Sequence, residues 1–144
     1  MMKILLIQGP NLHYLGKREP EIYGKTTAAE LDALLQQHAV DHQYQLEIFY
    51  TNIEGEAVNR IYQGLEDGVQ GIVMNPAAFG FNGYAIKDCL EAVKLPYIEV
   101  HISNIVKRKR ESILAEVANG VIFGFGIDGY FLALQGLLRL LKAI

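Results

Sequence analysis

Residues 71–104 read GIVMNPAAFGFNGYAIKDCLEAVKLPYIEVHISN. Gly71 to Asn75 and Tyr97 to Ile102 are short, largely apolar runs, and Tyr84 to Lys94 between them is predicted to be a helix. Apolar runs of this length are typical of strands that are buried on both faces of a sheet. The order strand, helix, strand therefore predicts two parallel strands joined by a right-handed crossover.

The same alternation continues on both sides of this stretch. Further strands are predicted at Ile4 to Ile7, Leu46 to Thr51 and Gly120 to Phe125, and further helices at Thr27 to about Gln43, Glu56 to Asp67 and Tyr130 to Lys142. Thr27 and Glu30 have the spacing of a capping box. Five strands alternating with helices predict a flavodoxin-like α/β fold, with a five-stranded parallel sheet in the order 2-1-3-4-5 and helices on both faces. In such sheets ligands bind at the carboxyl ends of the strands.

Length and composition favour one cytoplasmic domain that spans residues 1–144. The formal net charge of −3 argues against a general affinity for nucleic acid or for an anionic membrane. The lone Cys89 cannot form a disulfide within the chain, which favours a reducing compartment. The first apolar run stops at Gly9-Pro10 and is too short for a membrane span. The hydrophobic fraction of 51% suggests contacts between subunits.

A long polar loop is predicted directly after the first strand. Residues 9–25 read GPNLHYLGKREPEIYGK and contain Asn11, Arg18 and Tyr23 before any predicted helix begins. Loops of this length are usually functional or mobile, and a surface loop with incidental polar residues is the alternative. His101 lies near the end of the fourth predicted strand, where parallel sheets place their active sites.

Three other patterns favour structural interpretations. Residues 124–129, GFGIDG, match a dinucleotide motif, but no strand follows to supply the acidic residue that binds ribose, so a tight turn into the last helix is preferred. His38 and His42 are four residues apart, and a solvated helix end is a better interpretation than a metal site. The basic run 107–110 is interpreted as a solvated surface.

Several stretches together resemble one family. GPNLHYLGKREPEIYG at 9–24, NPAA at 75–78, EVHISN at 99–104 and FGFGIDGYFLAL at 123–134 are similar to motifs of the type II 3-dehydroquinate dehydratases. The resemblance implies a lyase of the shikimate pathway, which makes aromatic amino acids. It implies anti elimination of water from 3-dehydroquinate, a cyclic keto acid, through an enolate to give 3-dehydroshikimate. It also implies that no metal, cofactor or Schiff base takes part, and that the chain assembles as a dodecamer built from trimers.

The resemblance also implies roles for individual catalytic residues. Tyr23 would be the base, with Arg18 beside it, and His101 would be the general acid, oriented by Glu99. Asn11 would help to stabilise the enolate oxygen. A phenol is a weak base unless a positive charge stabilises its ionised form, and Arg18 is five residues away on the same loop.

Further residues match the family's substrate-binding positions. Asn75 and the backbone N–H groups of Ile102 and Ser103 would hold the substrate carboxylate. Asp88 matches an acid that family members lend to the site of a neighbouring subunit. Phe81 stands where the family has a histidine that contacts a substrate hydroxyl.

The pocket departs from the family at two places. Phe81 cannot form a hydrogen bond to a hydroxyl, and the segment after Asn104 is shorter than the family's and has no clearly aligned pocket arginine, although Arg108 and Arg110 are nearby. An unpaired buried hydroxyl costs about 1–3 kcal/mol, so we expect 3-dehydroquinate to be turned over poorly compared with typical members. The alternatives are a lyase for a related, less hydroxylated cyclic keto acid, and a weakly active or non-catalytic oligomeric paralogue.

Overall fold

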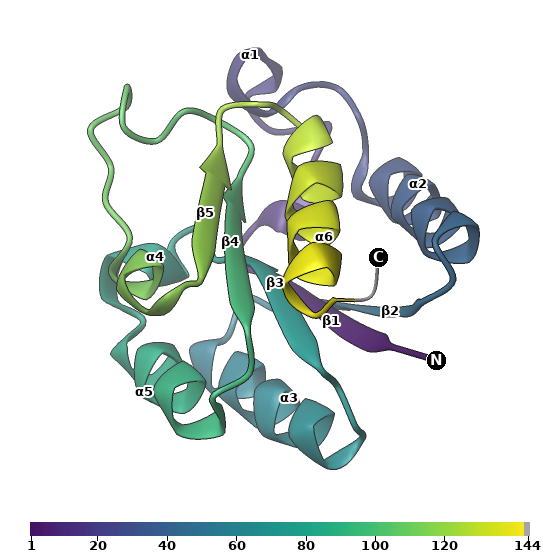
Figure 1. Cartoon of the computed structure of the whole chain (residues 1–144). Coiled ribbons are helices and arrows are strands. Elements are labelled where there is room, and N and C mark those ends of the chain that lie inside the picture. Colours follow the sequence, from purple (N-terminus) through teal and green to yellow (C-terminus); the bar gives the residue numbers. More distant parts are fainter. Residues whose placement is uncertain (143–144) are drawn as a thin grey trace.

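The computed structural model describes residues 1–142 and contains one parallel sheet of five strands. The strands run in the order β2-β1-β3-β4-β5, which confirms the order predicted from the sequence (Figure 1). Their bounds are β1 Lys3–Gln8, β2 Gln45–Tyr50, β3 Gly71–Asn75, β4 Tyr97–His101 and β5 Gly120–Phe123. The central strands β1, β3 and β4 are buried almost throughout, as expected for a sheet that is covered on both faces.

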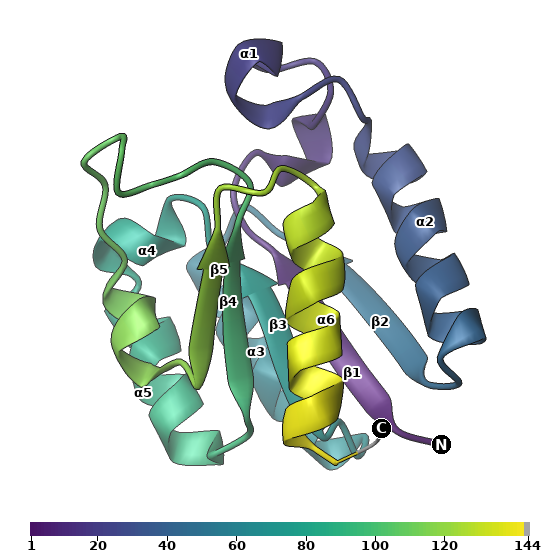
Figure 2. The same ribbon diagram turned by 45° about the horizontal axis from the view of Figure 1, so that its top comes forward.

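Helices cover both faces of the sheet. Helices α2 (Ala28–Asp41) and α6 (Asp128–Leu140) pack on one face, and α3 (Glu54–Glu66) and α5 (Tyr84–Val93) pack on the other (Figure 2). The alternation of side chains along β1 divides its apolar residues between the two cores, because neighbouring residues of a strand point to opposite faces. Each face of the sheet is therefore closed by its own hydrophobic cluster, and the edge formed by the strand ends is left for the loops.

The capping box predicted at the start of α2 is present. The backbone N–H of Glu30 donates to Thr27 Oγ1 at 3.1 Å, and the backbone N–H of Thr27 donates to Glu30 Oε1 at 3.0 Å. Both bonds satisfy groups that have no partner inside the helix. They fix the point at which the long loop after β1 ends and α2 begins.

The prediction of a loop without helix over residues 9–25 is wrong. This segment contains a short 3-10 helix, η1 (Leu12–Tyr14), and one helical turn, α1 (Pro20–Tyr23). Pro20 is the first residue of α1, where its fixed backbone angle suits a helix and no N–H is required. In Figure 2, α1 lies beyond the arrowheads of the strands, so the turn holds Tyr23 over the carboxyl edge of the sheet.

Two more short elements lie on the β4 and β5 side of the molecule. These are α4 (Phe79–Asn82), which follows β3, and η2 (Ile113–Val117), which precedes β5. They pack closely, since a Cβ atom built on Gly80 of α4 would lie 2.9 Å from Ser112 Oγ, next to η2. This contact fixes the position of α4 beside the segment that follows β4.

The loops after β1 and β3 approach each other at the point where the strand order reverses. A Cβ atom on Gly9 would lie 2.4 Å from the carbonyl oxygen of Pro76, so any side chain at residue 9 would force the two loops apart. The backbone N–H of Gly9 donates to the carbonyl of Asn75 at 2.9 Å. Among residues 1–142, no helix is both long enough and apolar enough to cross a membrane.

Candidate active site

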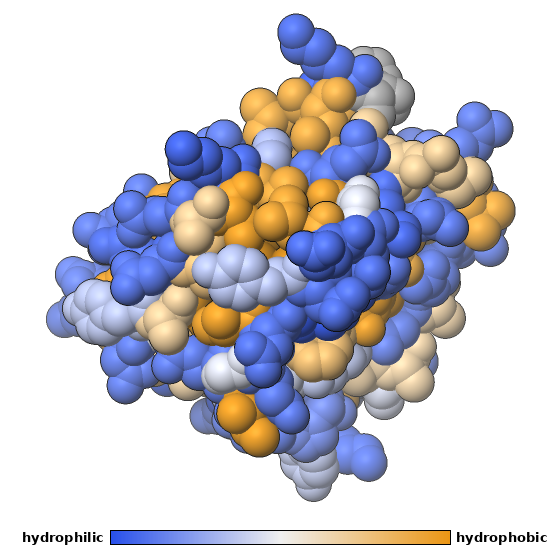
Figure 3. Space-filling model, turned by 90° about the horizontal axis from the view of Figure 1, so that it is seen from below, coloured by the Kyte–Doolittle hydropathy of each residue, from blue (hydrophilic) through white to orange (hydrophobic). Residues whose placement is uncertain are grey.

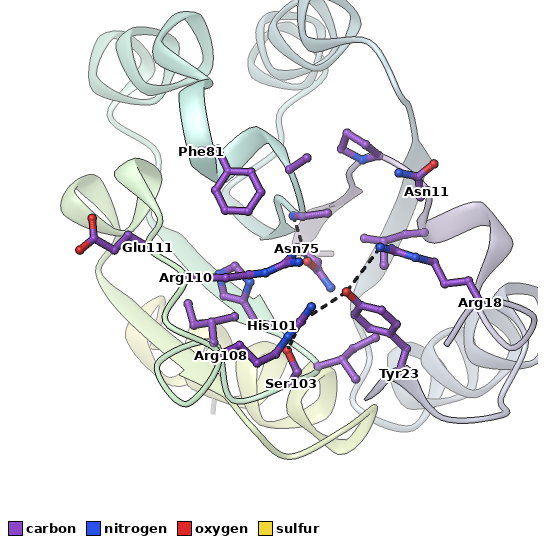
Figure 4. Close-up of a pocket in the computed structure, with 16 residues that line it drawn as sticks. Asn11, Arg18, Tyr23, Asn75, Phe81, His101, Ser103, Arg108, Arg110 and Glu111 are labelled. Atoms are coloured by element: carbon purple, nitrogen blue, oxygen red, sulfur yellow. Dashed lines mark hydrogen bonds between the residues drawn. The ribbon is translucent and has the colours of Figure 1, made fainter. Parts of the chain in front are cut away.

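An open cleft lies over the carboxyl ends of β1, β3 and β4. Its volume is about 600 Å³, including the space that is open to solvent. The loop after β1, the segment 75–81 and the segment 101–111 supply its walls (Figure 4). Most of the residues that the sequence nominated line this cleft: Asn11, Arg18, Tyr23, Asn75, Phe81, His101, Ile102 and Ser103.

Two guanidinium groups donate hydrogen bonds to the phenol oxygen of Tyr23. Arg18 Nη2 donates to Tyr23 Oη at 3.4 Å and Arg108 Nη1 donates to the same oxygen at 3.3 Å (Figure 4). The Arg18 guanidinium also lies over the Tyr23 ring, with Cζ 4.4 Å from the ring centroid. Two positively charged groups thus converge on one phenol oxygen in the cleft.

Arg108 belongs to the shortened segment in which no pocket arginine aligns clearly from the sequence. Its Nη1 also donates to Ser103 Oγ at 2.9 Å, which ties the guanidinium to the end of β4. The chain turns back after Asn104, whose side-chain oxygen accepts from the backbone N–H of Lys107 at 3.1 Å. Arg108 and Arg110 both line the cleft. The interpretation of the run 107–110 as solvated surface is therefore incomplete: Arg110 is exposed, as expected, whereas Arg108 is partly buried. The sequence feature that could have indicated their place in the cleft is the position of the run, which begins soon after EVHISN.

His101 is held by a buried carboxylate. His101 Nε2 lies 2.7 Å from Glu99 Oε2, and the hydroxyl of Tyr97 donates to Glu99 Oε1 at 2.6 Å. These three residues alternate along β4, so their side chains point to the same face of the sheet. Glu99 is fully buried and His101 is 8% exposed, so the imidazole is at the floor of the cleft and the carboxylate lies behind it.

Asn75 is at the end of β3 and is held from two sides. Its Oδ1 accepts from the backbone N–H of Ala77 at 3.2 Å, and its Nδ2 donates to Tyr130 Oη at 2.9 Å. The Tyr130 hydroxyl in turn donates to Gln8 Oε1 at 2.7 Å. Burial raises the pKa of Tyr130, which keeps the phenol protonated and able to donate. One N–H of the Asn75 amide remains for a ligand in the cleft.

Asn11 lies on the opposite side of the cleft from Glu111 (Figure 4). Its backbone adopts a left-handed conformation with φ of 70°, and its backbone N–H donates to Asn52 Oδ1 at 2.9 Å. Asparagine is among the few residues that tolerate this conformation. The bond from the loop after β2 thus fixes the backbone from which the Asn11 side chain projects.

Phe81 and Arg110 form one wall of the cleft. The Arg110 guanidinium carbon is 5.5 Å from the centroid of the Phe81 ring, and the arginine side chain extends past this ring toward Asn75 (Figure 4). Phe81 is 51% exposed. Asp88 lies elsewhere: it is exposed on α5 and does not line the cleft of its own chain.

Comparison with known proteins identifies the family. The model of the family described as dehydroquinase class II matches residues 2–138. The chain belongs to the class II dehydroquinase family. A 3-dehydroquinate dehydratase of Bacillus cereus (strain AH187) is 46% identical over 145 residues, which cover 99% of each chain. A 3-dehydroquinate dehydratase of Prochlorococcus marinus (strain MIT 9215) is 45% identical over 99% of this chain and 98% of its own.

The fold of this dehydroquinase family member also agrees with solved structures. The crystal structure of type II dehydroquinase from Butyrivibrio crossotus DSM 2876 superposes with a TM-score of 0.90 at 39% sequence identity. The alignment covers 94% of this chain and 97% of that one. The fold and the family expected from the sequence motifs are thus confirmed over nearly the whole chain.

The structure also shows the surroundings of the remaining sequence patterns. In the part of the chain that the structure describes, no group of three or more His, Cys, Asp or Glu side chains is placed to hold a metal ion. The rings of His38 and His42 stack with centroids 3.9 Å apart, and His38 Nδ1 lies 2.9 Å from the Tyr44 hydroxyl. Gly124 and Gly126 have positive φ angles just before α6 begins, which confirms the tight turn.

Proposed function

We propose that this chain converts 3-dehydroquinate into 3-dehydroshikimate by anti elimination of water through an enolate, without a metal, a cofactor or a Schiff base. The proposal rests mainly on the observation that Tyr23 and His101 line the same cleft. The phenol oxygen of Tyr23 accepts hydrogen bonds from two arginines there. Tyr23 is suited to remove a proton and His101 to supply one.

Tyr23 is the proposed base. The proton to be removed lies next to a ketone and becomes acidic only when the enolate is stabilised by groups already in place. Arg18 and Arg108 stabilise negative charge on the Tyr23 oxygen, so the phenolate can accept this proton. The side chain of Asn11 is the proposed partner of the enolate oxygen.

His101 is the proposed general acid. With Glu99 bound to Nε2, the other ring nitrogen is left to deliver a proton to the leaving hydroxyl. The buried Glu99 carboxylate stabilises the protonated imidazole before the transfer and fixes the plane of the ring. The free N–H of Asn75 and the backbone N–H groups of Ile102 and Ser103 are proposed to hold the substrate carboxylate.

The charge of the cleft fits an anionic substrate. The chain has a formal net charge of −3, whereas three guanidinium groups, from Arg18, Arg108 and Arg110, line this one cleft. A local positive potential attracts a carboxylate and orients it on approach. A non-catalytic binding protein would need this charge, but it would not need a phenol and an imidazole arranged for proton transfer.

A less hydroxylated cyclic keto acid remains the second candidate substrate, because Phe81 presents an apolar ring to the cleft. The position of Arg110 favours 3-dehydroquinate, since its guanidinium lies beside that ring and can donate to a hydroxyl. The wall of the pocket where Phe81 replaces the family's histidine thus has a hydrogen-bond donor, the guanidinium of Arg110.

Arg110→Gln is expected to lower kcat/KM for 3-dehydroquinate by about 10- to 100-fold, mainly through a higher KM. A hydrogen bond from a charged donor contributes about 1.5–3 kcal/mol, and each 1.4 kcal/mol is tenfold in affinity. Steady-state kinetics measure the change, and Lys109→Gln, which removes the same charge outside the cleft, is the matched control. Equal effects of the two substitutions would show that Arg110 does not contact the substrate.

We expect the chain to be an oligomer, a dodecamer of trimers located in the cytoplasm. Large apolar side chains are exposed outside the cleft, and Figure 3 shows such groups between polar ones on one face. Leu34 of α2 and Tyr62 and Leu65 of α3 are all more than 40% exposed. Asp88 is expected to contribute to the site of a neighbouring subunit. Sedimentation at micromolar concentration should show a species of several subunits, and a monomer would contradict this.

A further inference from the structure

We infer that Tyr97 is a positioning residue of the active site, which acts through Glu99 to hold His101 ready for proton transfer. The inference rests on the proposed function of His101 and extends it to a group at the far end of the hydrogen-bonded chain. Tyr97 does not line the cleft, so it has no contact with a substrate there.

The contacts form one continuous chain from the interior to the cleft. The Tyr97 hydroxyl donates to Glu99 Oε1 at 2.6 Å, and Glu99 Oε2 lies 2.7 Å from His101 Nε2. Tyr97 is 1% exposed and Glu99 is 0% exposed. Each carboxylate oxygen therefore has one donor, Tyr97 at Oε1 and His101 at Oε2.

A buried carboxylate needs such donors. Removal of an ionised carboxyl group from water is costly unless hydrogen bonds or opposite charges replace the hydration. His101 supplies one replacement, and it is the group whose charge changes during the proposed reaction. Tyr97 supplies a second hydrogen bond, from a group whose charge does not change during the reaction. This bond keeps Glu99 ionised and in position while His101 gives up its proton.

The surroundings of Tyr97 keep its hydroxyl protonated. Burial and the charge of Glu99 raise the pKa of Tyr97 well above its ordinary value, so its hydroxyl keeps its proton. The hydrophobic cluster that contains Tyr97 includes Cys89, and burial also raises the pKa of that thiol. Helices α3 and α5 and the turn η2 also contribute to this cluster. Their charged side chains are exposed or partly exposed: Glu54, Glu56, Arg60, Glu66, Lys87, Asp88, Glu91 and Glu116. Arg110 and Glu111 line the same cleft as His101.

Tyr97→Phe tests the inference, because it removes only the hydroxyl and keeps the buried ring. We expect kcat for 3-dehydroquinate to fall about tenfold or more with little change in KM, the usual effect of a lost hydrogen bond to a charged group. We also expect the acid limb of the pH–rate profile to shift to higher pH in this variant. The reason is that the Glu99 carboxylate, with one hydrogen-bond donor fewer, is protonated more easily. Tyr44→Phe, another buried phenol with one hydrogen bond, is the matched control and should change neither quantity.

A second variant shows whether Tyr97 acts through Glu99. In a Glu99→Gln background, Tyr97→Phe should reduce kcat by less than twofold, because the charge that the hydroxyl supports is gone. If Tyr97→Phe has the same effect with and without Glu99→Gln, or if it matches Tyr44→Phe, the inference is wrong.

A measurement without substrate separates this inference from the proposed function. The chain has four histidines, and the imidazole NMR signals of His101 are identified by their loss in His101→Gln. Their titration should change in Tyr97→Phe and remain as in the unmodified protein in Tyr44→Phe. If the unmodified protein does not convert 3-dehydroquinate, the proposed function fails, and the titration still decides the role of Tyr97. An unchanged titration in Tyr97→Phe would overturn the inference.

Discussion

Tyr23→Phe is expected to reduce the conversion of 3-dehydroquinate to the background rate while the fold is kept. The substitution removes one oxygen, which is the atom that both Arg18 and Arg108 contact. Without that oxygen the two guanidinium groups have no base to support, and no other side chain in the described cleft combines a proton acceptor with two adjacent positive charges. The ring of Tyr23 and its contact with the Arg18 guanidinium are retained.

The measurement for Tyr23→Phe is a steady-state assay combined with a circular dichroism spectrum. Tyr14→Phe is the matched control, because Tyr14 is on the same loop and 51% exposed and does not line the cleft. We expect Tyr14→Phe to keep the rate of the unmodified protein. A Tyr23→Phe variant that works at nearly that rate would show that the base is a different group.

His101→Ala is expected to lower kcat by about 10²- to 10⁴-fold, the usual contribution of a general acid. The imidazole is the group that connects the buried Glu99 carboxylate to the cleft, so its removal leaves the leaving hydroxyl without a proton donor. It also leaves Glu99 with Tyr97 as its remaining donor, which makes some loss of stability expected.

His13→Ala is the control for this substitution, since His13 is exposed and lies outside the cleft. Thermal unfolding of His101→Ala shows whether the variant is folded at the temperature of the assay. His101→Gln keeps a polar side chain at the position and should be about as inactive. A change below tenfold in both variants, with elimination confirmed as the rate-limiting step, would count against the role of His101.

The fold could be predicted from the sequence because its determinants are local. Continuous apolar runs identified the strands, and the Thr27 and Glu30 pair marked the start of α2. The buried positions of the helices are less easily read from the sequence, since Leu34, Tyr62 and Leu65 are large apolar residues of α2 and α3 and are exposed. The periodic pattern shows which residues share a face, but not where the buried stripe ends.

The candidate active site could be predicted only in part, because half of its contacts join segments that are far apart in the sequence. Arg18 and Tyr23 are five residues apart, and Glu99 and His101 are neighbours on one strand face, so short motifs mark them. Arg108 is 85 residues from Tyr23 and reaches it through a turn whose geometry depends on Asn104 and on backbone hydrogen bonds. In the same way, the contact between Arg110 and Phe81 joins two loops that are far apart in the sequence.

The measurement that tests the central claim most directly is the incubation of the purified, unmodified protein with 3-dehydroquinate in the presence of EDTA. The conjugated product absorbs in the ultraviolet, so its formation is followed continuously, and Tyr23→Phe at the same concentration serves as the blank. The proposed mechanism predicts steady formation of 3-dehydroshikimate by the unmodified protein and none above background by Tyr23→Phe. A folded, unmodified protein that forms no product, or equal rates for the two proteins, would contradict it.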